Sequence, residues 1–203
     1  MEGYHEFDSN THDCRMKELL EERIQAVFQL EKEALSQFLK CTSIVKYPAK
    51  RMLVEDGKTC KKLYYIMQGA VRSYYLKDGK EIVIWLALED DIITAFNSFI
   101  SQTKSNEYLE LIEDSVLTEI SHENLNGLIS KYHSVCRLYG MLLQEAFMDL
   151  SNQYQDIHFS TSLRKYENLL SKHPEIINRI PLGYIASYLG VTQESLSRIR
   201  SMR

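Results

Sequence analysis

The segment from Leu182 to Arg200 contains two short amphipathic stretches that meet at a glycine. Apolar residues recur at helical spacing on one face of each stretch, namely Ile185, Ala186 and Leu189 in the first and Leu196 and Ile199 in the second. Gly190 gives the backbone freedom that a tight turn needs, Val191 fills the turn from inside, and Thr192 is a good N-cap for a second helix. Because each stretch is too short to be stable alone, the pattern predicts a helix-turn-helix.

The other face of the second stretch carries side chains that can bond to base edges and phosphates: Gln193, Glu194, Ser197, Arg198 and Arg200. An arginine can donate two hydrogen bonds to guanine, and a glutamate can accept one from cytosine. Glu194 and Arg198 lie four residues apart, so the spacing predicts that they read adjacent positions in a major groove. The alternative is a surface ion pair, which at this spacing contributes only about 0.2–0.5 kcal/mol.

The charge of the chain is distributed unevenly. The whole sequence has a formal net charge of -4, which by itself argues against nucleic acid as a partner. From Thr161 to Arg203, however, seven Lys/Arg stand against three Asp/Glu, a net of +4, which leaves the first 160 residues at -8. This asymmetry is typical of a DNA-reading module attached to an acidic sensor, since phosphate neutralisation supplies much of the free energy of DNA binding.

No sequence feature indicates secretion or a membrane. The four cysteines, Cys14, Cys41, Cys60 and Cys136, are far apart, which favours free thiols in a reducing cytosol. The N-terminus is polar, and the longest apolar run, Ile82 to Leu88, is too short to cross a bilayer. We therefore expect a cytoplasmic protein of two domains with no membrane partner.

The rest of the chain divides by its periodicity. Residues 16 to 40 have helical periodicity, whereas short runs rich in Val, Ile, Tyr and Leu extend from about Ile44 to Ile120, with turn signals such as Asp56-Gly57 and Asp78-Gly79 between them. This spacing of turns predicts a sandwich or roll. Helical periodicity returns from about Glu123 to Phe159, and Lys172-His-Pro174 ends a further helix.

Apolar residues form a seam along the predicted helix over 123–159: Val135, Leu138, Leu142, Ala146 and Leu150. Such a seam packs either on its own domain or on a second copy of itself. The length of the helix favours a homodimer interface, because a helix that is buried only against a small roll is usually shorter.

In its order of parts the chain resembles the Crp/Fnr superfamily of bacterial transcription factors. The most specific matches are Ile44-Val-Lys-Tyr-Pro-Ala-Lys50, Leu63-Tyr-Tyr-Ile-Met-Gln-Gly-Ala-Val71, Asp78-Gly-Lys-Glu-Ile82 and Glu194-Ser-Leu-Ser-Arg198. The residues of these motifs are most similar to those of the Bacteroidetes branch. The resemblance implies an α+β protein. It would comprise an N-terminal helix and a cyclic-nucleotide-binding-type β-roll (a double-stranded β-helix) over residues 1–122, a long dimerisation helix over 123–159 and a helix-turn-helix domain over 160–203.

The resemblance also implies a function and roles for individual residues. Members of the superfamily bind inverted repeats in double-stranded DNA as homodimers, and RNA polymerase is a further partner that it allows. Members with the Glu-x-x-Ser-Arg pattern read a TGA-like core in each half-site through the glutamate and the arginine. The resemblance assigns these roles to Glu194 and Arg198, with Ser197 beside them and Thr192 as a phosphate contact. Many relatives add a β-hairpin wing, whereas this sequence ends at Met202-Arg203. We expect this branch to dispense with the wing, because Arg198, Arg200 and Arg203 remain to meet bases and phosphates.

The stretch that would hold a cyclic nucleotide departs from the family pattern. Members that bind cyclic AMP use a Gly-Glu pair and an arginine for the phosphate, but Ile92 to Tyr108 contains neither glycine nor arginine. Only Lys104 would meet a buried phosphate, and burying an unpaired anion costs several kcal/mol. The sequence therefore predicts no response to cyclic AMP by the familiar mode. Trp85, Phe96 and Phe99 could line a pocket with Lys104 for an apolar or aromatic effector of unknown identity, although such aromatic residues are more often ordinary core.

The sequence contains no motif for an iron–sulfur cluster, a haem, a metal site or an enzyme active site. One cysteine near the N-terminus does not suit an iron–sulfur cluster, and no histidine lies between His12 and His122 to ligate haem or a cupin-type metal. The sequence also contains no nucleophile elbow or phosphate loop, so we expect neither a cofactor nor an enzyme. The alternative to a DNA-binding regulator is a ligand- or partner-binding roll whose helix-turn-helix has become a packing element.

Overall fold

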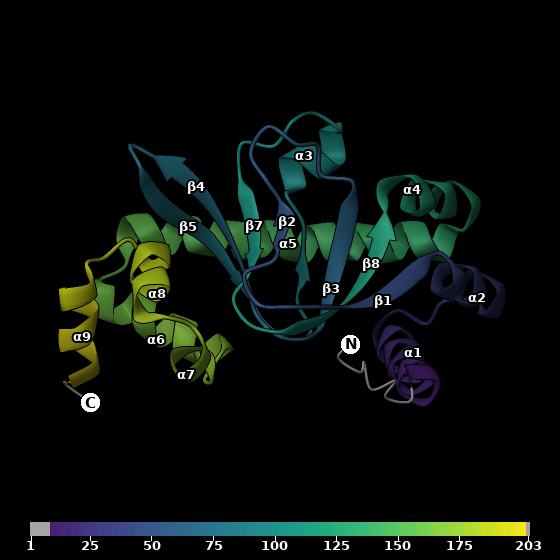
Figure 1. The fold of residues 1–203 in the computed structure, drawn as a ribbon, viewed down its shortest axis with the longest axis horizontal. Helices are drawn as coiled ribbons and strands as arrows, with labels where there is room; N and C mark the ends of the chain where they lie inside the picture. Colours follow the sequence, from purple (N-terminus) through teal and green to yellow (C-terminus); the bar gives the residue numbers. More distant parts are fainter. Residues whose placement is uncertain (1–8, 202–203) are drawn as a thin grey trace, which may run out of the picture.

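The computed structural model describes residues 9–201 as a β-roll with helices at both ends (Figure 1). The eight strands are β1 Thr42–Tyr47, β2 Met52–Val54, β3 Lys62–Gln68, β4 Val71–Lys77, β5 Lys80–Ala87, β6 Ile92–Ile93, β7 Tyr108–Leu111 and β8 Ser115–Ser121. They pair antiparallel in two four-stranded sheets, β1-β8-β3-β6 and β2-β7-β4-β5. The predicted α+β fold with a roll of the cyclic-nucleotide-binding type is confirmed.

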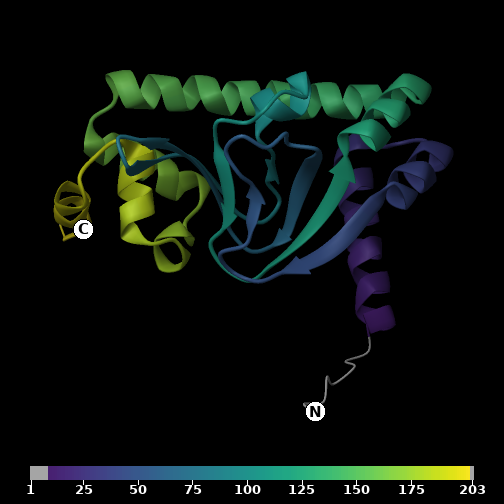
Figure 2. The same ribbon diagram turned by 45° about the horizontal axis from the view of Figure 1, so that its top comes forward.

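The helices of the described chain flank this roll. They are α1 Ser9–Phe28, α2 Lys32–Lys40, α3 Phe96–Ser101, α4 His122–Lys131, α5 His133–Phe159, α6 Ser162–Lys172, α7 Ile176–Arg179, α8 Leu182–Leu189 and α9 Gln193–Ser201. In Figure 2, α5 runs along one side of the molecule from the end that carries α2 and α4 to the end that carries α6 to α9. One helix therefore connects the roll to the C-terminal helices.

Two segments that helical periodicity predicts as continuous are each divided. The lead-in breaks between α1 and α2, where Gln29 has a positive φ of 46°. The predicted helix over 123–159 breaks at Tyr132, whose φ and ψ of -122° and 114° are those of extended backbone. Neither break contains the glycine or proline that marks such a point in a sequence, and the periodicity of the apolar residues continues across both. The sequence therefore contains no local signal for either break.

The C-terminal helices share a core with the hairpin of β4 and β5. Tyr74, Val83 and Leu86 of the hairpin belong to the same buried cluster as Ile185 and Leu189 of α8. Burying such side chains is worth about 1.5–3 kcal/mol each. The roll and the helix-turn-helix are thus packed against each other rather than joined only by α5.

The turn between β3 and β4 depends on Gly69. Its φ of +116° lies where side chains rarely fit, and a Cβ built there would lie 2.1 Å from Ser115 Oγ and 2.9 Å from Ser115 Cα. Its N–H also donates to Glu89 Oε1 at 2.8 Å. This close approach of two backbones requires a glycine.

We expect Gly69→Ala to lower the free energy of unfolding by roughly 2 kcal/mol more than Gly57→Ala does. Gly57 is a matched control, because its φ is also positive, at +79°, but no atom lies within 4 Å of a Cβ at that position. Urea unfolding followed by circular dichroism measures both losses. Equal losses would show that backbone strain alone, and not contact with Ser115, makes Gly69 necessary.

Candidate DNA-binding interface

The helix-turn-helix forms through local hydrogen bonds that its sequence supplies. At the end of α8, Gly190 has a φ of 65°, and the N–H of Val191 donates to the carbonyl of Ala186 at 3.0 Å. The hydroxyl of Thr192 accepts from the N–H of Ser195 at 3.2 Å and so caps α9. The glycine turn and the N-cap predicted from the sequence are both present.

The predicted reading face of α9 lies in solvent. Leu196 is fully buried and Ile199 is half-buried, whereas every predicted DNA contact in the described chain is exposed: Thr192, Gln193, Glu194, Ser197, Arg198 and Arg200. Arg203 lies outside the described residues. Gln193 packs closely against α8, because a Cβ at Gly183 would lie 2.8 Å from its Nε2. The absence of a side chain at Gly183 therefore lets the first residue of α9 approach α8.

Electrostatics at the start of α9 keep Glu194 ionised. Its pKa is lowered, first by its own backbone N–H at the helix N-terminus, then by the Thr192 hydroxyl and the charge of Arg198. Among the described residues, no ion pair joins Glu194 to Arg198. A carboxylate that stays ionised and is not held by an ion pair is free to accept a hydrogen bond from a base.

The opposite side of the helix-turn-helix is attached to the roll through α8. The hydroxyl of Ser187 accepts from the N–H of Val83 at 2.9 Å. The guanidinium carbon of Arg72, in β4, lies 4.2 Å from the ring centroid of Tyr74 and 3.9 Å from that of Tyr184. Arg72 also pairs with Glu81 and Glu110. The contact thus holds α8 and leaves α9 uncovered.

A second attachment joins α7 to the loops of the roll. Arg179 donates to both carboxylate oxygens of Glu89, at 2.6 and 2.8 Å, and also pairs with Glu113. Burial raises the pKa of Glu89, but the hydrogen bonds from Arg179 and from the N–H of Gly69 outweigh it and lower the pKa to about 2. Glu89 therefore stays ionised and ties α7 to the turn at Gly69.

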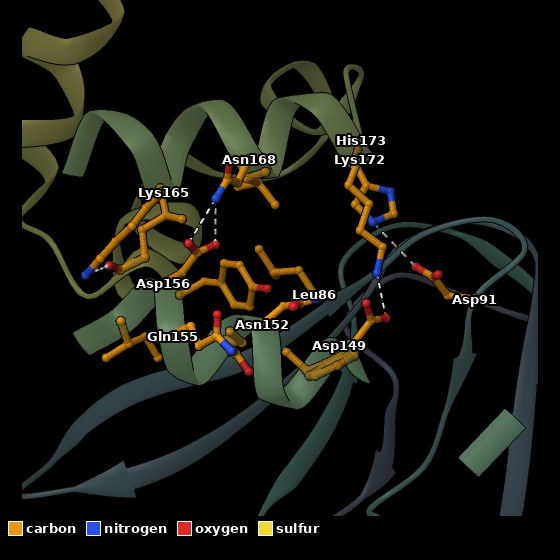
Figure 3. Close-up of a pocket in the computed structure, with 16 residues that line it drawn as sticks. Leu86, Asp91, Asp149, Asn152, Gln155, Asp156, Lys165, Asn168, Lys172 and His173 are labelled. Carbon is orange, nitrogen blue, oxygen red and sulfur yellow. Dashed lines mark hydrogen bonds and ion pairs between the residues drawn. The ribbon is translucent and has the colours of Figure 1, made fainter. Parts of the chain in front are cut away.

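A cleft of about 340 Å³ lies where α5 meets α6 and the roll (Figure 3). Polar side chains bridge it: Lys172 Nζ lies 2.6 Å from Asp149, His173 Nε2 lies 4.0 Å from Asp91, and Asn168 donates to both oxygens of Asp156. The Lys172–Asp149 ion pair and the Asn168–Asp156 hydrogen bonds join α5 to α6 across the cleft. They tie the end of α5 to the C-terminal helices.

These attachments could not be predicted from the sequence. Arg72, Glu89 and Arg179 occur in no motif, and the partners that Arg179 binds are 90 and 66 residues away along the chain. Pairing over such distances is set by the docking of the two parts and not by local spacing. The charge of each residue alone is equally compatible with a solvated surface.

The predicted dimer seam on α5 needs correction. Val135 and Leu138 are buried in the core of their own subunit, and Leu142 and Ala146 are half-buried. Of the predicted residues only Leu150 is exposed, and it shares the free face of α5 with Phe147, Tyr154 and Ile157, which are 45 to 71% exposed. The helix has two apolar faces, and the periodicity of the sequence follows mainly the one that the roll covers.

The predicted effector residues do not converge on one cavity. Phe99 is buried and meets the ring of His122 edge-on, with centroids 5.2 Å apart, whereas Lys104 is exposed. Trp85 and Phe96 line a small hollow of about 80 Å³ beside α5. The aromatic residues thus serve mostly as core, which is the alternative that the sequence left open.

Among residues 9–201, no three His, Cys, Asp or Glu side chains are grouped in a way that could hold a metal ion. No helix in the same part of the chain is long and apolar enough to cross a membrane.

Comparison with known proteins supports the resemblance. Residues 44–132 match the family model of the cyclic nucleotide-binding domain. The chain is 24% identical over 179 residues to the cAMP-activated global transcriptional regulator CRP of Haemophilus influenzae, covering 83% of this chain and 80% of that protein.

Solved structures share the fold. FixK2 from Bradyrhizobium japonicum superposes with a TM-score of 0.69 at 18% identity, covering 79% of this chain and 83% of its own. A transcriptional regulator of the crp/fnr family from Eubacterium rectale has a TM-score of 0.65 at 19% identity, covering 84% and 82%. The chain is thus similar in sequence and in fold to regulators of the Crp/Fnr type, as its motifs predict, while its place in the Bacteroidetes branch stays a prediction.

The attachment through Arg179 gives a pH-dependent prediction. Because folding lowers the pKa of Glu89 from its ordinary 4.5, the stabilisation is fully present above that value and is lost as the pH falls towards 2. Arg179→Gln should cost about 1 kcal/mol of unfolding free energy near neutral pH. The difference from the wild type should shrink below pH 4.5, as measured by urea unfolding.

Arg164→Gln is the control, because Arg164 is an exposed arginine of α6. It should change stability little at any pH. A loss in Arg179→Gln that stays constant below pH 4.5 would contradict the role of Glu89.

Proposed function

We propose that this relative of the Crp/Fnr regulators is a sequence-specific DNA-binding transcription regulator that acts as a homodimer on an inverted repeat. The observation that carries the proposal is the orientation of the helix-turn-helix. Its α8 side is held by the β4–β5 hairpin, while every described DNA-reading side chain of α9 is exposed. This orientation leaves the polar face of α9 accessible to a groove of DNA.

Recognition rests on the first two turns of α9. Arg198 is the side chain for a guanine and Glu194 for a cytosine, four residues apart on one face. Thr192 and Arg200 flank them and can meet phosphates. The net charge of +4 from Thr161 to Arg203 adds sequence-independent attraction to the DNA backbone.

Dimer formation uses the free face of α5. Phe147, Leu150, Tyr154 and Ile157 follow one another at intervals of three, four and three residues, which is the spacing of a coiled-coil seam. All four are exposed in the single chain. A second copy of the same helix would cover this apolar strip through a two-fold axis, and a two-fold dimer reads an inverted repeat.

We also propose that cyclic AMP does not act on this roll by the familiar mode. Glu107 is buried in the roll and accepts from Ser73 Oγ at 2.5 Å, and burial raises its pKa while that bond opposes the rise. The stretch from Ile92 to Tyr108 contains no arginine, so the phosphate of a cyclic nucleotide would find no guanidinium partner there. Placing a phosphate beside Glu107 would cost several kcal/mol.

A second candidate function rests on the same contact between α8 and the roll. If the docking through Ser187 and Arg72 were the purpose of the helix-turn-helix, the chain would be a ligand- or partner-binding roll that no longer reads DNA. DNA binding separates the two candidates directly.

Arg198→Ala should weaken binding to a duplex with two inverted TGA half-sites by about 1–3 kcal/mol, because it removes a two-bond contact to a base. Binding to a scrambled duplex should change much less. Fluorescence anisotropy with labelled duplexes at fixed salt measures both affinities.

Arg164→Ala is the matched control, since it removes an exposed arginine of the same domain that lies outside α9. It should affect both duplexes equally. Equal losses for Arg198→Ala on the two duplexes would leave α9 without a reading role and favour the second candidate.

Leu150→Glu should convert the dimer to a monomer, because the two-fold axis would bring two carboxylates into an apolar seam. We expect the dimer dissociation constant to rise roughly a hundredfold or more. Sedimentation velocity over a range of concentrations measures the change. Leu76→Glu is the control, since Leu76 is similarly exposed, at 53%, but lies on β4. A Leu150→Glu protein that stays dimeric would place the interface elsewhere.

A further inference from the structure

A large apolar cavity lies outside the roll, between its β1-β8-β3-β6 sheet and the helices α1 and α5. Its volume is about 490 Å³, within the range of roughly 300–1,000 Å³ that is typical of small-molecule sites. Leu20 and Ile24 of α1, Leu63 and Ile120 of the sheet and Leu138 and Leu142 of α5 line it. It shares none of these residues with the cleft of Figure 3.

One polar atom in this wall has no partner. Thr118 is 4% exposed and lines the cavity from the middle of β8, where its register partner on β3 is Tyr65, another lining residue. Its hydroxyl oxygen is buried and makes no hydrogen bond. Leaving such a group unsatisfied costs about 1–3 kcal/mol, so a hydroxyl retained here points to a ligand that satisfies it.

Polar groups at the rim determine the charge of that ligand. The hydroxyl of Tyr65 accepts from Arg23 at 2.7 Å and donates to Asp90 at 2.6 Å, and Arg23 also pairs with Asp90. Glu145 adds a second carboxylate to the rim. Among the lining residues that the structure describes, Arg23 is the one cation, and it is already engaged. The remaining charge is negative, which disfavours an anionic ligand.

We propose that this cavity binds a small uncharged molecule with an aliphatic body and one hydroxyl or carbonyl group, which forms a hydrogen bond with Thr118. The apolar walls cover the body of the ligand, and the hydroxyl of Thr118 can donate to a carbonyl or accept from an alcohol. Because Leu138 and Leu142 belong to α5, the ligand would contact the helix that leads to the C-terminal domain. The binding itself does not depend on the proposed DNA-reading function.

The test uses 1-octanol, 2-octanone and octanoate as probes of the full-length protein, with affinities measured by calorimetry and by ligand-observed NMR. We expect saturable binding of the alcohol and the ketone, with octanoate at least about tenfold weaker because its charge would be desolvated beside Asp90 and Glu145. Tighter binding of octanoate would overturn the assignment of an uncharged ligand. No saturable binding of the neutral probes up to their solubility would overturn the site.

Two variants locate the site. Thr118→Val removes the hydroxyl at nearly constant shape and should lower octanol affinity about tenfold, the value of one hydrogen bond, while leaving the thermal stability equal or higher. Leu142→Trp should fill the cavity and abolish binding. Thr103→Val, at an exposed threonine after α3, should change nothing. Neutral probes that bind Thr118→Val as tightly as the wild type would contradict the role of Thr118 and place the ligand elsewhere.

Discussion

The packing of one face of α5 against the roll determines how the rest of the molecule is arranged. Val135 and Leu138 are buried in the roll core, and Gln153, near the other end of the helix, donates to the carbonyl of Ile84 at 2.7 Å. These contacts fix the rotation of the helix about its axis. They decide that Phe147 and Leu150 face outward, where a second copy can cover them, and they set the point from which the C-terminal helices depart.

The attachments between the roll and the C-terminal helices give α9, the proposed DNA-reading helix, a defined orientation. Arg179 binds Glu89, which also holds the turn at Gly69, so one carboxylate connects α7 to the roll. Arg72 connects the β4–β5 hairpin to Tyr184 of α8. Because each contact joins the two parts, a change in the roll or in α5 has a physical route to α9.

The sequence predicted what local patterns determine. Gly190 and Thr192 marked the turn and the cap of the helix-turn-helix, and Asp78-Gly79 marked the hairpin of β4 and β5. It failed where two patterns overlap or where a partner is distant. The two apolar faces of α5 produce a single helical periodicity in the sequence, which does not tell the face covered by the roll from the free face. The sequence therefore places Val135 in the dimer interface, although the roll covers it. The orphaned hydroxyl of Thr118 and the ion pairs of Arg179 exist only once the chain has folded.

We propose that the chain reads a specific DNA sequence without a cyclic nucleotide. The most direct measurement is selection from a random pool of duplex DNA by the purified protein with no added ligand, at two salt concentrations. We expect an inverted repeat with TGA-like half-sites to be enriched at both salt concentrations. Recovery of no motif, with only weak binding that the higher salt abolishes, would contradict it.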